Sequence, residues 1–141
     1  MALVDHFYEI GYETGQAVRW RVWRADGVPM AIASLWQRWT HPQTAEVVVS
    51  FSMLTVNADT HPVMREFHRP DDEKRSPLIL ADDQLASWLD ADMNQACAMV
   101  SAPDVLLRMP TLEACPDPVV PRNAQSSASP NVSEPPAICK S

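Results

Sequence analysis

The chain has 141 residues, of which 46% are hydrophobic, enough for one domain with its own core. Its formal net charge of -7 repels polyanions, so any contact with nucleic acid has to be local. No apolar run approaches the roughly 20 residues that a membrane-spanning helix needs, and the first residues lack the pattern of a secretion signal. We therefore expect a cytoplasmic protein with no membrane partner.

The first part of the chain has the patterns of β-strands. Residues 3–10 alternate loosely, and residues 17–24 alternate strictly, with Val18, Trp20 and Val22 on one face. Asp26-Gly27 then predicts a hairpin turn into an apolar strand over residues 28–36, buried on both faces. After a polar loop at residues 40–45, residues 46–56 predict another strand.

Helices are expected only in the second part. Residues 77–80 predict a short strand, and Asp82 then resembles a helix N-cap before the apolar positions Leu85, Trp88 and Leu89. Residues 92–100 predict a second helix, and residues 105–109 a last strand before Pro110. This order of elements predicts an α+β fold on an antiparallel or mixed sheet.

The end of the chain differs in composition from the rest. Eight of the 13 prolines lie at or after residue 103. We expect a folded domain over residues 1–115 and an extended to disordered, Pro/Ser-rich tail over residues 116–141. Cys97, Cys115 and Cys139 are odd in number and lack metal-ligand spacing, so they predict free thiols, no metal site and no cofactor.

Reactive side chains concentrate between Thr55 and Pro77. His68 follows Phe67, and with an ordinary pKa of about 6.5 it is a natural proton carrier. Around it, four acidic residues lie among four basic ones, so a solvated ion-pair loop is an open alternative to a binding site. These eight residues are Arg65, Glu66, Arg69, Asp71, Asp72, Glu73, Lys74 and Arg75.

Other candidates have weaker support from the residues alone. Glu9 follows two aromatic residues, which could desolvate it for acid–base work, but a solvated glutamate at a strand end is the commoner case. His6, His41 and His61 have no reactive neighbours. The five tryptophans could stack on bases, yet their periodicity places most of them in a core, with Trp23 and Trp39 as the expected exceptions.

Four motifs, taken in order, resemble the C-terminal half of a known family. They are Asp5-His-Phe-Tyr-Glu9, Arg24-Ala-Asp-Gly-Val-Pro-Met-Ala31 leading to Leu35-Trp-Gln-Arg-Trp39, Phe51-Ser-Met-Leu-Thr-Val-Asn-Ala-Asp59, and Phe67-His-Arg-Pro-Asp-Asp-Glu-Lys-Arg-Ser-Pro77. The family is that of the SOS-response-associated peptidases (SRAP), the abasic-site-processing proteins. The resemblance implies a sheet that forms part of a barrel-like domain, with short helices packed outside.

The resemblance also implies a function in the DNA-damage response. Members bind single-stranded DNA, crosslink to abasic sites through a cysteine at the mature N-terminus, and remove their own initiator methionine. By matching position, Glu9 and His68 would be catalytic, and Thr55 and Arg75 would bind the substrate. The expected partner is therefore single-stranded DNA with an abasic site.

Two departures limit that expectation. Ala2 stands where the family chemistry needs cysteine, and the family's N-terminal half has no counterpart in the sequence. Ser76 replaces the methionine of the family motif. We therefore expect a truncated domain that is inactive alone. A non-catalytic DNA-binding remnant and a non-functional gene fragment are the alternatives, and enzymatic activity and oligomeric state stay open.

Overall fold

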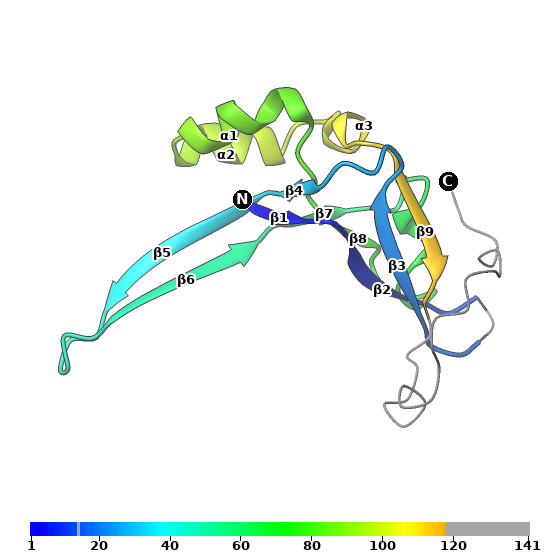
Figure 1. The fold of residues 1–141 in the computed structure, drawn as a ribbon, viewed down its shortest axis with the longest axis horizontal. Helices are drawn as coiled ribbons and strands as arrows, with labels where there is room; N and C mark the ends of the chain where they lie inside the picture. The colour runs from blue at the N-terminus through cyan, green and yellow to red at the C-terminus, as the bar shows by residue number, and fades with distance from the viewer. Residues whose placement is uncertain (14, 118–141) are drawn as a thin grey trace, which may run out of the picture.

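A computed structural model describes residues 1–13 and 15–117, which form short strands followed by short helices (Figure 1). No helix in this part of the chain is long and apolar enough to cross a membrane. The strands are β1 (Ala2–Val4), β2 (Phe7–Gly11), β3 (Val18–Arg24), β4 (Met30–Ile32), β5 (Ser34–Thr40), β6 (Val47–Met53), β7 (Thr55–Asn57), β8 (Arg75–Pro77) and β9 (Leu112–Pro116). The helices are α1 (Leu85–Asp90), α2 (Met93–Val100) and α3 (Val105–Arg108), with 3-10 turns η1 (Met64–Glu66) and η2 (Asp82–Gln84).

All strand pairs are antiparallel. β2, β3 and β9 form a three-stranded sheet in the order β2-β3-β9, and the other ladders are the pairs β1-β4, β5-β6 and β7-β8. This arrangement confirms the α+β class with antiparallel sheets. Within residues 1–13 and 15–117 no closed barrel is found, so the barrel-like part of the expectation stays a prediction.

The core joins segments that are distant in sequence. Trp20 and Val22 are buried on β3, as the strict alternation predicted. They belong to the same buried cluster as Met30 of β4, Phe67 and Leu112 of β9. Because Phe67 lies in this cluster, the loop that carries the next residue, His68, is attached to the most rigid part of the molecule.

One arginine is buried beside that core. The Arg24 guanidinium lies 2.6 Å from an oxygen of Asp26 and 2.7 Å from an oxygen of Asp82. Its hydrogen bonds hold the pKa of both carboxyls below the ordinary value. The contact ties the turn after β3 to the start of the helical region, and Asp82 therefore anchors the chain besides preceding α1.

Several predicted strands are divided in the structure. Residues 3–10 form β1 and β2, which pair with different partners, β4 and β3. Residues 46–56 are divided at Leu54, whose N–H donates to the carbonyl of Ala33. Gly27 makes a turn with φ 73°, but this turn connects strands of separate sheets, so the predicted hairpin there is wrong.

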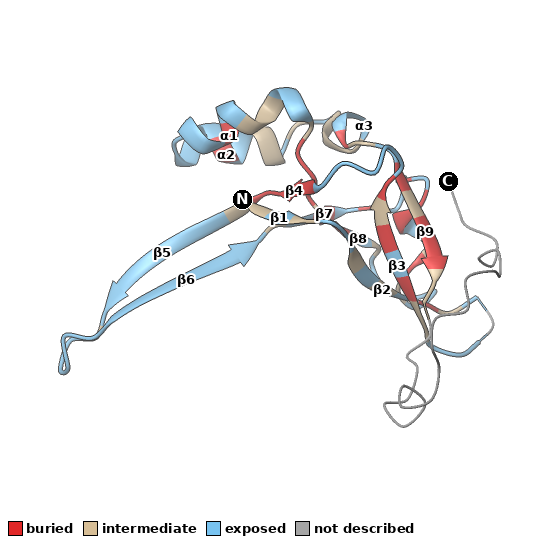
Figure 2. Cartoon of the chain, in the orientation of Figure 1, coloured by how far each residue is buried: buried red, intermediate tan, exposed pale blue. Residues whose placement is uncertain are grey.

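The predicted buried strand over residues 28–36 is also only partly correct. β4 is buried, whereas β5 leaves the core and pairs only with β6 in a long two-stranded ribbon (Figures 1 and 2). Trp36 is consequently 73% exposed. The expectation that it belongs to the core is therefore wrong. Directly opposite it, Phe51 is 66% exposed. The apolar pattern predicted a strand correctly, but it did not show whether another segment packs against that strand.

The last predicted strand is a helix instead. Residues 105–108 form α3, in which Arg108 bonds Asp104 at 2.7 Å across one helical turn. The strand at this end of the chain is β9, which completes the sheet beside β3. The helices expected after Asp82 and over residues 92–100 are confirmed as α1 and α2. The proposed tail lies outside the described residues except for 116 and 117.

Candidate functional site

Glu9 lies in the middle of β2, opposite Trp20 of β3. Its side chain is partly buried. Burial raises the pKa of the Glu9 carboxyl, while the charge of His68 and the N–H of Ile10 act in the opposite direction. A glutamate with a raised pKa keeps its proton more readily than an ordinary carboxyl, as a general acid must.

His68 is held next to β2 by its own backbone. Its φ is 64°, in the left-handed region, and its N–H donates to the carbonyl of Ile10 at 3.1 Å. The preceding residue, Phe67, makes a β-bridge with Gly11. These contacts fix the histidine loop against the strand that carries Glu9. A left-handed residue that is not glycine often marks a functional site, because the strain has to be offset by its surroundings.

One nitrogen of the His68 ring is held by a hydrogen bond to the backbone. Nε2 lies 3.0 Å from the carbonyl oxygen of Arg75. A carbonyl can only accept, so Nε2 carries a hydrogen; whenever the ring is neutral, Nδ1 is the nitrogen that accepts. His68 therefore presents a nitrogen that can accept a proton while its other side keeps the ring in place.

Two aromatic rings and one glycine support this arrangement. Phe67 is 1% exposed and packs edge-on against Trp20, with ring centroids 5.9 Å apart. A Cβ on Gly11 would lie only 2.8 Å from Nε1 of Trp20. Glycine at position 11 thus lets the tryptophan lie close to β2.

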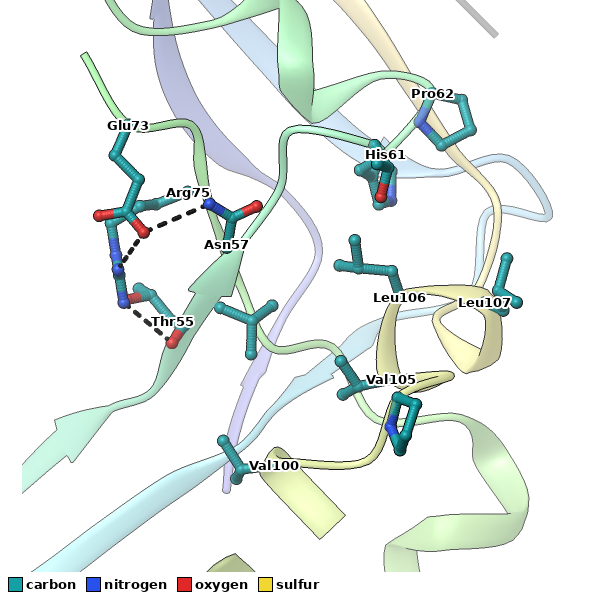
Figure 3. Close-up of a pocket in the computed structure, with 13 residues that line it drawn as sticks. Thr55, Asn57, His61, Pro62, Glu73, Arg75, Val100, Val105, Leu106 and Leu107 are labelled. Carbon is teal, nitrogen blue, oxygen red and sulfur yellow. Dashed lines mark hydrogen bonds and ion pairs between the residues drawn. The ribbon is translucent and has the colours of Figure 1, made fainter. Parts of the chain in front are cut away.

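Thr55 and Arg75 are placed by the β7-β8 ladder. Arg75 lies opposite Asn57 and Pro77 opposite Thr55, so these side chains share a face. The Arg75 guanidinium donates to Oγ1 of Thr55 from Nε at 3.0 Å and from Nη2 at 2.8 Å, and to Glu73 at 3.1 Å (Figure 3). The Arg75 side chain is still 44% exposed, so these contacts orient a guanidinium that can also meet an anion.

The four candidate residues are linked one to the next. Glu9 interacts electrostatically with His68, His68 bonds the backbone of Arg75, and the Arg75 side chain bonds Thr55. The structure therefore links a glutamate, a histidine, an arginine and a threonine that lie far apart in the sequence. No group of three or more histidine, cysteine or carboxylate residues in the described part of the chain could hold a metal ion.

Comparison with known proteins gives the family. The profile described as "SOS response associated peptidase (SRAP)" matches residues 1–114. The chain belongs to the SRAP family. Comparison with curated proteins gave no match.

Two solved structures resemble the SRAP chain. A crystal structure of a Bordetella bronchiseptica protein has 34% sequence identity and a TM-score of 0.69, and the match covers 83% of this chain and 53% of that one. A crystal structure of a Bacteroides thetaiotaomicron protein has 14% identity and a TM-score of 0.60, covering 90% of this chain and 51% of that one, and supports the fold alone. The SRAP chain thus spans about half the length of the solved structures that it matches.

Sequence patterns had missed several residues of the site. Glu73 was one of eight charged residues for which an ion-pair loop and a binding site were both open, and it forms an exposed ion pair with Arg75 and lies 3.4 Å from the amide of Asn57. His61 was set aside because no reactive residue adjoins it, but it lines a pocket beside Thr55. The position of Asn57 two residues after Thr55 on a strand was the available signal, since such residues share a face.

The cysteines of the SRAP chain correct one expectation. Cys97 is a free and exposed thiol, as predicted. Cys115 is disulfide-bonded, so the prediction of a free thiol is wrong for that residue. Cys139 lies outside the described residues. Widely spaced cysteines carry no local signal of pairing, because pairing depends on the distance between them in the folded chain.

Replacing Glu9 by glutamine should make the SRAP chain more stable at neutral pH. Because burial raises the pKa above its ordinary value of 4.5, the folded state holds the proton more tightly than the unfolded state. Stability is therefore lost as the pH rises through the raised pKa, and glutamine avoids that loss. Urea unfolding at about pH 4 and about pH 7 should show the advantage of the variant mainly at the higher pH. Equal differences at both pH values would contradict the assignment.

Proposed function

We propose that this chain binds single-stranded DNA at abasic sites and provides the proton-transfer residues for covalent capture of the ring-opened sugar. The observation that carries the proposal is the linked set of Glu9, His68, Arg75 and Thr55, in a chain that belongs to the SRAP family. Glu9 and His68 are the catalytic pair of this proposal. Thr55 and Arg75 are its substrate-binding residues.

The chemistry needs proton transfers in both directions. An amine adds to the aldehyde of the opened sugar, and loss of water from this adduct gives an iminium ion, which a thiol then attacks to close a thiazolidine ring. The overall change is aldehyde plus amino thiol to thiazolidine plus water. Nδ1 of His68 accepts the proton released by the attacking nitrogen and returns it to the adduct oxygen, which becomes a hydroxyl. Glu9 in its acid form protonates this departing hydroxyl to give water, and the proton released by the thiol on ring closure restores the acid form of Glu9.

The four residues of the proposed site include no thiol, so an assay of the Glu9–His68 pair supplies the amino thiol as free cysteine. The absence of a thiol among these four residues favours a second candidate function, in which the chain binds abasic single-stranded DNA without catalysing any step.

Both functions predict that Arg75 contacts a phosphate. Replacing Arg75 by glutamine should weaken binding of a single-stranded oligonucleotide with a central abasic analogue and reduce the salt slope by about 0.7 for the lost phosphate contact. Fluorescence anisotropy over a series of salt concentrations measures both quantities. Arg65→Gln is the matched control, because Arg65 is also exposed and paired with a glutamate, Glu66, at 3.0 Å. Equal affinity of native protein and Arg75→Gln would refute the proposed contact.

A further inference from the structure

A pocket of about 610 Å³ lies beside Thr55 and Arg75, on the side that faces α3 (Figure 3). Neither Glu9 nor His68 lines it. One wall is formed by β7 with Arg75 and Glu73, and the opposite wall by apolar side chains that include Val100, Val105 and Leu106. The volume is within the range of sites for small organic groups, and polar side chains line the pocket besides the apolar ones.

The pocket contains one buried hydrogen-bond donor. His61 is only 4% exposed, and its Nδ1 accepts the N–H groups of Val63 at 3.2 Å and Met64 at 3.1 Å. Nδ1 is thus occupied and the ring hydrogen lies on Nε2. Burial lowers the pKa of His61, which keeps the ring neutral.

The Nε2–H group of His61 has no partner among the described residues. Every fully buried side-chain nitrogen and oxygen in that part of the chain has a hydrogen bond, so Nε2 is not fully enclosed, and His61 is one of the residues that line the pocket. A ligand in the pocket would therefore meet a donor fixed in one direction. Such a donor selects a group with an acceptor on its edge and penalises one without it.

The residues that line the pocket include the cation of the proposed DNA contact, Arg75. Its guanidinium donates three hydrogen bonds to Thr55 and one to Glu73, which leaves one of its five N–H groups to meet a phosphate. If Arg75 binds a phosphate, the group next to that phosphate along the DNA strand would lie in this pocket. In single-stranded DNA this is a nucleobase, a planar ring with two apolar faces and acceptors on its edge.

We infer that the pocket between β7 and α3 holds the unstacked nucleobase of a nucleotide next to the abasic site, with one base edge bonded to Nε2–H of His61 and one face packed on Val105 and Leu106. This inference rests on the proposed function. Every nucleobase has edge acceptors, so the subsite tolerates different sequences. It requires only that a base is present.

The test removes the base and not the backbone. Two single-stranded oligonucleotides carry a central abasic analogue, and one of them carries a second analogue in place of the adjacent base, on the 5′ or the 3′ side. We expect the native chain to bind the oligonucleotide that keeps the base roughly 5- to 10-fold more tightly, the low end for base stacking because the wall is aliphatic. Fluorescence anisotropy gives both affinities.

Two variants test whether the difference in affinity between the two oligonucleotides depends on the pocket. Leu106→Asn makes the wall polar without adding charge, and Val105→Thr does so with almost no change of shape, which keeps the test open if the first variant unfolds. In both variants, the affinity for the oligonucleotide that keeps the base should fall close to the affinity for the one with two abasic analogues. The affinity for the oligonucleotide with two abasic analogues should stay unchanged. Leu89→Asn, at an exposed position of α1 outside this pocket, should keep the native ratio.

The outcomes separate the subsite from the proposed function. An equal affinity of the native chain for the two oligonucleotides, on both sides of the lesion, would overturn the subsite, and so would a full ratio in both pocket variants. If Arg75→Gln still weakens binding in that case, the proposed function stands without the subsite. If the native chain binds neither oligonucleotide, both proposals fall.

Discussion

Replacing Glu9 by glutamine, or His68 by asparagine, is expected to slow thiazolidine formation by roughly 10²- to 10⁴-fold, the usual contribution of a positioned acid or base. The reaction contains the protein, free cysteine and a single-stranded oligonucleotide with a natural abasic site. Mass spectrometry follows the cysteine adduct of the oligonucleotide. Each variant removes a proton carrier and keeps a side chain of similar size.

Asparagine is the informative choice at position 68. It tolerates the left-handed backbone of His68, φ 64°, better than most residues do. The asparagine amide nitrogen takes the place of Nδ1 and does not reach that of Nε2, so the 3.0 Å contact with the Arg75 carbonyl is lost together with the proton carrier. A urea midpoint equal to that of the native chain would show that a slow reaction reports the lost proton carrier and not a displaced loop.

Glu66→Gln is the control for the glutamate. Glu66 lies on the loop before Phe67, so the change removes a carboxyl near the site but outside the Glu9–His68 pair. Its rate should equal the native rate. If the native protein reacts no faster than the Glu9→Gln and His68→Asn variants, the catalytic proposal is wrong, and binding without chemistry is the remaining function.

Replacing Phe67 by alanine should give the largest loss of stability. The ring is 1% exposed, packs on Trp20 and belongs to the main core, and truncation of such a residue costs about 3–5 kcal/mol. Small domains have about 5–15 kcal/mol in total, so the variant should be near its unfolding threshold at 25 °C. Urea unfolding measures the change.

Phe51→Ala is the matched control for that loss. Phe51 has the same side chain but is 66% exposed on the β5-β6 ribbon, and such a surface change should alter stability by less than about 0.5 kcal/mol. A large loss in Phe51→Ala would mean that the ribbon is covered in solution. A small loss in Phe67→Ala would contradict the core that holds the histidine loop.

Local sequence patterns predicted where strands and helices form better than they predicted which segments pack against them. Strict alternation in residues 18–24 fixed both β3 and its buried face, because period two has one structural meaning. The apolar run around Trp36 predicted a strand correctly but wrongly predicted burial, since a sequence does not show which other segment covers a strand. Residues 105–109 are too short for periodicity, and the i,i+4 pair of Asp104 with Arg108 was the missed sign of a helix.

The four residues of the candidate site were predicted together only from the resemblance to the SRAP family, and not from the periodicity or spacing of the sequence. Nothing near Glu9 in the sequence predicts that it interacts with His68. That contact depends on the bridge between Gly11 and Phe67 and on the bond from the His68 N–H to Ile10, both of which are tertiary. The ladder that joins Thr55 to Arg75 is likewise formed between strands that no periodicity pairs.

We propose that Glu9, His68, Thr55 and Arg75 form one site for abasic single-stranded DNA. Two-dimensional NMR of the isotopically labelled chain, titrated with an oligonucleotide that carries an abasic analogue, tests this proposal. We predict that the amide signals of these four residues shift together along one binding curve, and shift less with the undamaged oligonucleotide. Shifts confined to other surfaces, such as the β5-β6 ribbon, or four unchanged signals at saturating DNA would contradict the claim.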